Sequence, residues 1–197
     1  MKTLTTGAFA LAAMVFAGAA QAQEQTPIQH GAPIQGVCVL NLQAVFARST
    51  AGQGLATRLG ELQREVASEL APYEQAIQSE SQALNQAGDS LAAADRQQRT
   101  QALQQRFNEF QQLAQQRGQE LEYTEIMQRR ALSEAADPVV RNVYQQRGCS
   151  ILLDRQSVYS LNPQMDISEA VLQGLNSQLP ALPAFNRMPV PVQQPQQ

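Results

Sequence analysis

The sequence predicts an α+β protein that is mostly α-helical, with a small β-sheet body and a long antiparallel coiled-coil helical hairpin that projects from it. A long polar stretch with regularly spaced apolar residues, a Gly-Asp turn signal near its middle and short β-rich runs on both sides indicate this fold class. Aromatic residues are only 5% of the 197 residues and Trp is absent, so a large single core is not expected.

The first 22 residues have the features of a removable export signal. Lys2 supplies a positive start, residues 4–19 are apolar and small, and Ala20-Gln21-Ala22 fits the small-x-small cleavage rule. The apolar run is short and rich in Ala, which disfavours a membrane anchor. We expect cleavage after Ala22 and a mature chain without a membrane span. Residues 23–35 carry Pro and Gly without periodicity and predict a disordered leader.

Short β-rich runs on both sides of the helical stretch predict the sheet of the body. Residues 36–42, GVCVLNL, predict a first strand, and residues 149–154 and 157–161 predict two more strands joined by a tight turn. The body is therefore assigned to residues 36–50 and 148–179. Strands this short do not stabilise a monomer well, which favours oligomerisation. The apolar strand residues are the candidates for the core of the body or of the oligomer: Val37, Val39, Leu40, Ile151, Leu152, Leu153, Val158 and Tyr159.

The C-terminal part of the chain predicts one short helix and a tail. Residues 166–176, DISEAVLQGLN, have one apolar face, and either Ser168 or Asp166 can cap the helix. Residues 180–197 are rich in Pro and Gln and predict a disordered tail.

The two cysteines, Cys38 and Cys149, each lie in a short apolar run. In an exported protein two cysteines suggest a disulfide, whereas in the cytosol they would be interpreted as buried thiols. A bridge requires the two runs to be neighbours in the fold. The sequence leaves both the bridged and the free state open.

Residues 51–147 predict the helical hairpin, with Ser49 and Thr50 as possible N-caps. Large apolar residues recur mostly three or four positions apart before and after Gly88-Asp89, as in a coiled coil. Folding back near residues 86–90 places apolar residues opposite one another: Tyr73 with Leu103, Val66 with Phe110, Leu62 with Ala114 and Leu55 with Leu121. Heptad spacing produces some such matches by chance, so one continuous helix is the alternative.

Two further features of the arm concern its packing. Pro72 removes a backbone hydrogen bond and is expected to kink the first helix near residues 68–70. Residues 95–102, DRQQRTQA, contain no large apolar side chain. We therefore expect the distal third of the arm to be weakly packed and mobile.

The sequence does not favour an enzyme, a cofactor or a metal site. His30 is the only histidine and lies in the leader, and two cysteines make a poor metal site. AGQG, residues 51–54, follows a strand but lacks the rest of a phosphate-binding loop, so we interpret it as a helix start. The formal net charge of −3 disfavours binding to nucleic acid.

The order of these elements resembles the OmpH/Skp family of periplasmic chaperones over about residues 36–178. The resemblance rests on VCVLNLQAVFARSTAGQ, with Asn41 and Phe46 after the first strand, on GCSILLDRQSVYSLN and on MDISEAVLQGLN. It implies a periplasmic homotrimer whose hairpins surround a cavity and hold unfolded outer-membrane proteins without ATP, with the outer-membrane assembly machinery as a further possible partner.

Residues near the end of the arm are the candidates for contact with such clients. Leu and Ile at these spacings more often form the seam of the arm itself. The chain departs from the basic members of the family because it is mildly acidic. The candidates are Ile77, Leu84, Leu91, Arg96, Arg99, Leu103 and Arg106. The alternative function is a non-enzymatic scaffold of the cell envelope that uses the hairpin as a spacer and the tail as a docking peptide.

Overall fold

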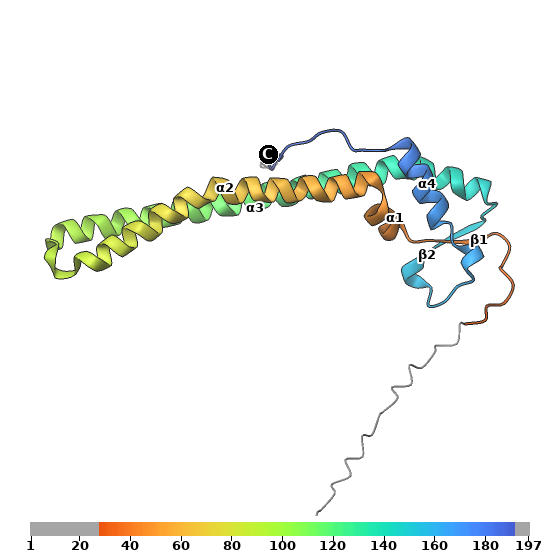
Figure 1. The fold of residues 1–197 in the computed structure, drawn as a ribbon, viewed down its shortest axis with the longest axis horizontal. Coiled ribbons are helices and arrows are strands. Elements are labelled where there is room, and N and C mark those ends of the chain that lie inside the picture. The colour runs from red at the N-terminus through yellow and green to blue at the C-terminus, as the bar shows by residue number, and fades with distance from the viewer. Residues whose placement is uncertain (1–27, 192–197) are drawn as a thin grey trace, which may run out of the picture. The chain divides into compact units, whose positions relative to one another are not determined.

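A computed structural model describes residues 28–191, apart from the side chain of Asp89. The predicted export signal, residues 23–27 of the leader and residues 192–197 of the tail lie outside the described residues. The predicted fold class is confirmed, because long helices dominate the chain and the sheet is small (Figure 1). The helices and strands, in order, are β1 (Val37–Leu40), α1 (Leu42–Arg48), α2 (Thr50–Ala87), α3 (Ala93–Gln146), β2 (Ile151–Asp154) and α4 (Ser168–Gln178).

The sheet of the body consists of two parallel strands, β1 and β2. Val37 lies opposite Ile151, and Leu40 lies opposite Asp154. On its other side, β1 is bonded to the segment before α4, where the N–H of Ile167 donates to the carbonyl of Val39 at 2.9 Å. Because the two strands flank the hairpin in the sequence, their pairing brings the two ends of the hairpin together.

The predicted third strand, residues 157–161, is wrong. Arg155–Ser157 forms a 3-10 helix that the carboxylate of Asp154 caps by accepting from the N–H of Gln156 at 2.8 Å. The guanidinium of Arg155 then donates to the carbonyl of Val158. After these local bonds, residues 158–161 pair with no strand, and Tyr159 is fully exposed.

The core of the body is built mainly by helices. Val39 and Leu40 are buried as predicted, whereas Val37, Leu152 and Val158 are half-buried. Ile151, Leu153 and Tyr159 are exposed, so they do not belong to the core of the single chain. Their places are taken by buried residues of α1, α3 and α4 and the segment before α4, namely Val45, Ala136, Val139, Val143, Ile167, Val171, Leu172 and Leu175.

The sequence pattern does not predict helix α1, because residues 41 and 42 continue the predicted first strand. The side chain of Asn41 ends β1 and caps α1, because its oxygen accepts from the N–H of Ala44 at 2.9 Å. Ser49 then ends α1 and caps α2, accepting from the N–H of Gly52 at 3.0 Å and donating to the carbonyl of Phe46 at 3.0 Å. The AGQG segment forms the first turn of α2, as its interpretation as a helix start predicted, and Gly52 within it lies close to the carbonyl of Phe46 at the corner between the two helices.

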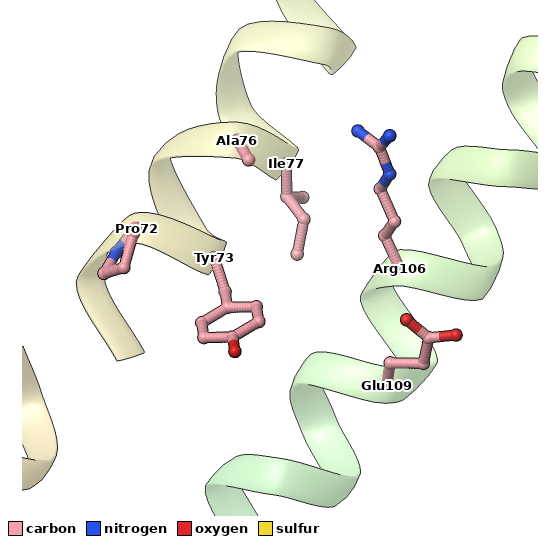
Figure 2. Close-up of a pocket in the computed structure, with 6 residues that line it drawn as sticks. All are labelled: Pro72, Tyr73, Ala76, Ile77, Arg106 and Glu109. Carbon is pink, nitrogen blue, oxygen red and sulfur yellow. The ribbon is translucent and has the colours of Figure 1, made fainter. Parts of the chain in front are cut away.

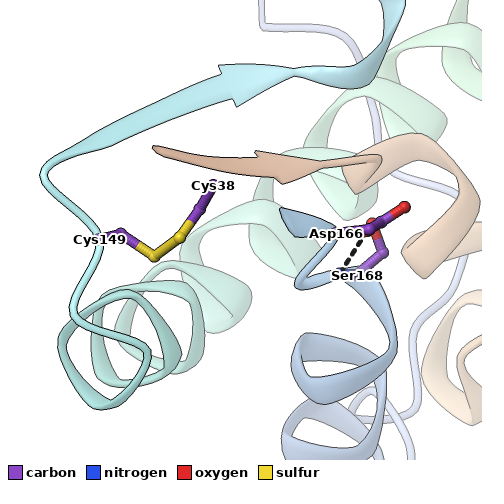
Figure 3. The surroundings of a disulfide bond; sticks show 4 residues. All are labelled: Cys38, Cys149, Asp166 and Ser168. Atoms are coloured by element: carbon purple, nitrogen blue, oxygen red, sulfur yellow. Dashed lines mark hydrogen bonds between the residues drawn. A yellow bond between two sulfur atoms is a disulfide. The ribbon is translucent and has the colours of Figure 1, made fainter. Parts of the chain in front are cut away.

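A disulfide joins Cys38 of β1 to Cys149, which follows α3, with the two Cα atoms 5.7 Å apart (Figure 3). The structure thus contains the bridged state of the two that the sequence left open. The bond closes a loop that contains the entire hairpin. In the chain-entropy model, closing a loop of roughly this length stabilises the folded state by about 4 to 5 kcal/mol. The N-cap position of α4 is Ile167, not Ser168 or Asp166. Figure 3 also shows that the carboxylate of Asp166, just before it, accepts from the N–H of Ser168, the first residue of the helix, at 2.8 Å.

Helices α2 and α3 form the antiparallel hairpin, so the single continuous helix is wrong (Figure 1). The chain reverses through a 3-10 turn at Gly88–Ser90, where Gly88 has a φ of 47°. α2 stays helical across Pro72, although that residue has no N–H to donate.

The predicted pairing of the two helices is displaced. Leu55 packs with Leu132 instead of Leu121, and Glu69 is paired with Arg117. One reason is that the segment between the helices extends from Gly88 to Ala92, so the helices pair about a point beyond Gly88.

We predict that Gly52→Ala destabilises the protein while Gly54→Ala does not. A Cβ at position 52 would lie 1.8 Å from the carbonyl oxygen of Phe46, whereas a Cβ at position 54 meets nothing within 4 Å. We expect the first change to lower the free energy of unfolding by roughly 2 kcal/mol or more, and the second to raise it by about 0.5 kcal/mol through helix propensity. Urea unfolding followed by circular dichroism measures both; equal stability of the two variants would contradict the close corner.

Candidate functional site

The arm has a packed base and an unpacked end. Leu55, Leu62 and Val66 of α2 are buried, as are Thr124 and Leu132 of α3. Between residues 67 and 119, here called the distal arm, no residue with a described side chain is buried. Two helices alone cannot cover their shared seam, so few contacts resist local opening there. This agrees with the weak packing expected near the turn and extends it over more of the arm.

The distal arm exposes two aromatic side chains, one of which, Tyr73, the predicted pairing placed opposite Leu103 in the seam. Tyr73 of α2 is 50% exposed and Phe107 of α3 is 41% exposed. Pro72, Tyr73 and Ile77 line one side of a hollow of about 450 Å³, and Arg106 and Glu109 line the other (Figure 2). The spacing of Tyr73 from its apolar neighbours is typical of a seam residue, and the displaced pairing of the two helices leaves its side chain half outside the seam.

The apolar client-contact candidates lie partly in the seam. Ile77, Leu84, Leu91 and Leu103 are each half-buried. They are therefore neither fully covered nor fully presented to solvent. Opening of the distal arm would increase their exposure, because the two helices cover each other there.

The three arginine candidates differ in their contacts. Arg99 pairs with Glu80 across the arm, with Nε and Oε1 2.8 Å apart, and Arg96 donates to the carbonyl of Gly88 at the turn. Arg106 is exposed and lines the hollow beside Tyr73. The hydrogen bond from Arg99 holds the pKa of Glu80 below its ordinary value, and burial opposes this only in part.

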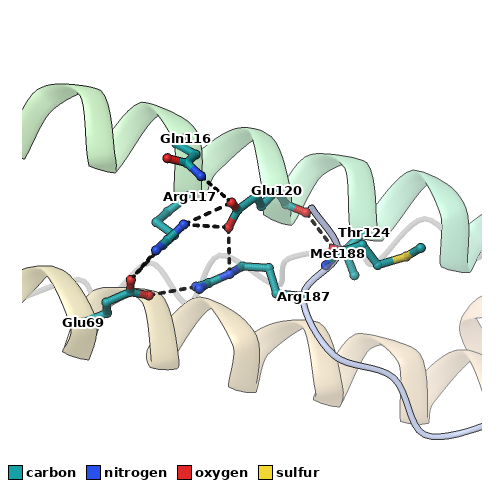
Figure 4. A network of polar contacts seen from close by, with 7 residues as sticks. All are labelled: Glu69, Gln116, Arg117, Glu120, Thr124, Arg187 and Met188. Atoms are coloured by element: carbon teal, nitrogen blue, oxygen red, sulfur yellow. Dashed lines mark hydrogen bonds and ion pairs between the residues drawn. The ribbon is translucent and has the colours of Figure 1, made fainter. Parts of the chain in front are cut away.

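A network of charges connects the two helices where the packed base ends (Figure 4). Arg117 of α3 lies 2.7 Å from Glu69 of α2 and 3.0 Å from Glu120. Arg187, from the C-terminal segment, lies 3.0 Å from Glu69 and 2.9 Å from Glu120. Glu120 is among the buried residues, and two arginines neutralise its charge.

The prediction of a disordered tail is wrong for residues 180–191. This segment, here called the C-terminal tail, runs back along the base of the arm (Figure 1). Leu182 and Phe185 pack against the apolar cluster of Ala51, Leu55 and Leu132. The Pro residues of this segment and the Gln residues that follow it favour disorder. Local sequence does not reveal the docking, because Ala51, Leu55 and Leu132 lie far from the tail in the sequence.

The described residues contain neither a candidate metal site nor a candidate membrane-spanning helix. No group of three or more His, Cys, Asp or Glu side chains within residues 28–191 could hold a metal ion. None of the helices in this part of the chain is long and apolar enough to cross a bilayer.

The comparisons with known proteins agree with this arrangement. A family model described as outer membrane protein (OmpH-like) matches residues 36–175. The chain belongs to the OmpH-like family. A crystal structure from Caulobacter crescentus CB15, assigned as an OmpH-like outer membrane chaperone, is 30% identical to the chain, with a TM-score of 0.77. The match covers 86% of this chain and 99% of that chain. Among curated proteins no match is found.

Membership of the OmpH-like family supports a chaperone role for the chain. The family match ends at residue 175, so the C-terminal tail lies outside it.

We predict that acid weakens the charge network through Glu69. The hydrogen bond from Arg117 is the main cause of its lowered pKa, Arg187 adds to it, and partial burial opposes both. Because the folded pKa lies below the ordinary value of 4.5, the network stabilises the fold above that pH, and the stabilisation is lost as the pH falls through the folded pKa.

The measurement is the thermal midpoint between pH 6 and pH 3 for the wild type and Glu69→Gln. The variant should show a shallower fall below about pH 4.5. Glu122 is exposed on α3. Glu122→Gln therefore serves as the control, and its thermal midpoint should follow that of the wild type. Equal slopes for Glu69→Gln and the wild type would contradict the prediction.

Proposed function

We propose that the protein is an ATP-independent periplasmic holdase that binds unfolded outer-membrane proteins. The observation that carries the proposal is the distal arm, which combines exposed aromatic residues with a length of helix that buries no described side chain. Membership of the OmpH-like family and the likeness to a structure assigned as an outer membrane chaperone support it.

The mechanism is retention by many weak contacts. α2 has 38 residues, which corresponds to an arm roughly 57 Å long at 1.5 Å per residue. Tyr73 and Phe107 offer apolar area to an unfolded chain, while the surrounding Gln-rich surface keeps each contact weak. Because the distal arm opens at low cost, it can adapt to clients of different size and release them without an energy source.

Electrostatic capture of acidic clients or anionic lipid is not favoured in this chain. Arg99, one of three arginines near the turn, is already paired with Glu80. The formal net charge of the chain is −3. We therefore assign binding chiefly to the apolar contacts, with Arg106 beside the hollow as an accessory contact.

We propose further that three copies assemble through the body. Ile151 and Leu153 of β2 and the neighbouring Tyr159 are exposed in the single chain, and exposed apolar side chains beside an open strand are typical of interfaces.

We predict that the mature protein has the mass of a trimer in light scattering and that Ile151→Glu with Leu153→Glu lowers it to that of a monomer. A wild-type monomer would contradict the assembly.

A scaffold role with the tail as a docking peptide is less well supported. Residues 182–188 of the tail are held by the arm of the same chain and are not presented to a partner. The possible partnership with the outer-membrane assembly machinery stays a proposal.

We predict that the mature protein suppresses aggregation of a porin diluted from urea, and that Tyr73→Ser with Phe107→Ser weakens this. Losing two half-exposed aromatic contacts of ~1 kcal/mol each should lower the apparent affinity by about tenfold or more. Aggregation is followed by light scattering against the molar ratio of chaperone to porin.

The matched control is Ile126→Ser, which removes a 55% exposed apolar side chain from the base of α3, the helix that also carries Phe107. This variant should keep the wild-type activity. Failure of the wild type to suppress aggregation at several-fold excess of trimer would refute the holdase, and equal loss in the control would refute the assignment to the distal arm.

A further inference from the structure

The C-terminal tail is held in the manner of a bound peptide. Residues 180–191 form no helix or strand, yet Leu182 and Phe185 are both inserted against the apolar cluster at the base of the arm. Pro183 lies between these two residues and Pro189 follows, so the segment is stiff and has little conformational freedom to lose on docking. The contact surface is formed by α2 and α3 together.

Side chains of the arm bind the backbone of the tail. Nε of Arg58 donates to the carbonyl of Phe185 at 3.2 Å, and the N–H of Met188 donates to the hydroxyl of Thr124 at 2.8 Å. Thr124 is fully buried and donates in turn to the carbonyl of Glu120 at 2.6 Å, which fixes its hydroxyl as an acceptor for the tail. Backbone contacts of this kind do not depend on the sequence of the bound segment.

The negative charge of Glu69 and Glu120 favours a basic residue two positions after Phe185, where the tail carries Arg187. Arg187 reaches both Glu69 and Glu120 at distances of 3.0 Å and 2.9 Å (Figure 4). Arg117 bonds both carboxylates but brings only one positive charge, so it cannot by itself balance Glu69 and Glu120. The surface therefore combines an apolar pocket for Phe185 with a net negative position for a cation.

We propose that the tail is an intramolecular ligand of a peptide-binding surface on the base of the arm. When the tail leaves, this surface accepts extended segments that carry an aromatic residue followed two positions later by Arg. That these segments belong to unfolded clients rests on the proposed holdase function. The surface and its recognition pattern do not depend on that function. The base of the arm then becomes a second binding region, distinct from the distal arm.

The tether explains why the tail normally occupies the surface. A segment joined by a short linker acts at an effective concentration on the order of millimolar. A free peptide with the same contacts must compete against the tail. Its apparent affinity for the intact protein equals its intrinsic affinity multiplied by the fraction of molecules in which the tail is released. Clients with several suitable segments can displace the tail, while a single short segment cannot.

The test measures binding of a fluorescent peptide with the sequence of residues 180–191, PALPAFNRMPVP, to full-length mature variants. Phe185→Ala with Arg187→Gln releases the tail while keeping its length. We expect the peptide to bind this variant at least about tenfold more tightly than the wild type, by fluorescence anisotropy at low salt. Val190→Ala, which changes an exposed tail residue, should bind the peptide as weakly as the wild type.

Two further peptides test the recognition pattern. A Gly/Ser peptide that carries only Leu-x-x-Phe-x-Arg should bind the released variant, and the same peptide with Glu in place of Arg should bind about tenfold more weakly or not at all. Equal binding of the tail peptide to the released variant and the wild type, or no binding up to about 1 mM, would overturn the proposal. Binding of the tail peptide without the Gly/Ser peptide would overturn the recognition pattern.

Controls separate this result from folding and from the holdase assay. Circular dichroism should show the same helix content in the released variant and the wild type, and deletion of residues 180–197 provides a second released form. The peptide assay contains no client protein. A protein that binds the peptide but fails to suppress porin aggregation would therefore refute the holdase and leave the peptide-binding surface supported.

Discussion

The pairing of β1 with β2 is the constraint on which the rest of the structure depends. The two strands lie on either side of the hairpin in the sequence, and their parallel register places Cys38 and Leu152 side by side. Both helices of the arm must therefore leave from one place and meet again at one turn. The Cys38–Cys149 disulfide fixes the same closure covalently. With its ends held in this way, the hairpin can project far from the body without support at its tip.

The packing of the arm follows from that arrangement. Near the body, α2 and α3 are covered by α1, α4 and the tail, and side chains such as Leu62 and Leu175 become fully buried. Beyond Val66 no described side chain is buried until Glu120 of α3, so the seam is only half-buried there and aromatic side chains are left outside. A stable base and an adaptable end therefore arise from the number of covering elements, and both properties suit the proposed holdase function.

The charge network and the tail lie at the boundary between these two regions. Arg187 joins Glu69 of α2 to Glu120 of α3 at the level where burial ends. An ionic contact at this point is sensitive to acid and salt, whereas the apolar contacts of Leu182 and Phe185 are not. If the tail can be displaced by a suitable segment, occupancy of the base and opening of the distal arm become linked, because both act on the same pair of helices.

The sequence by itself determined the elements that depend on local patterns. The apolar spacing specified two long helices, Gly88 supplied a residue that tolerates a positive φ at the turn, and the β-rich runs at Val39 and Leu152 specified two strands. Local patterns also suggested a third strand at Tyr159, where side-chain bonds of Asp154 and Arg155 prevail, and a continued strand at Asn41, whose side chain caps a helix instead.

Only the tertiary structure decided the pairing along the arm, the exposure of Tyr73 and Phe107, and the docking of the tail. These features depend on which residues meet across the two helices. A heptad pattern permits several such pairings with similar local energies, and the long-range contacts at the body and the turn select one of them.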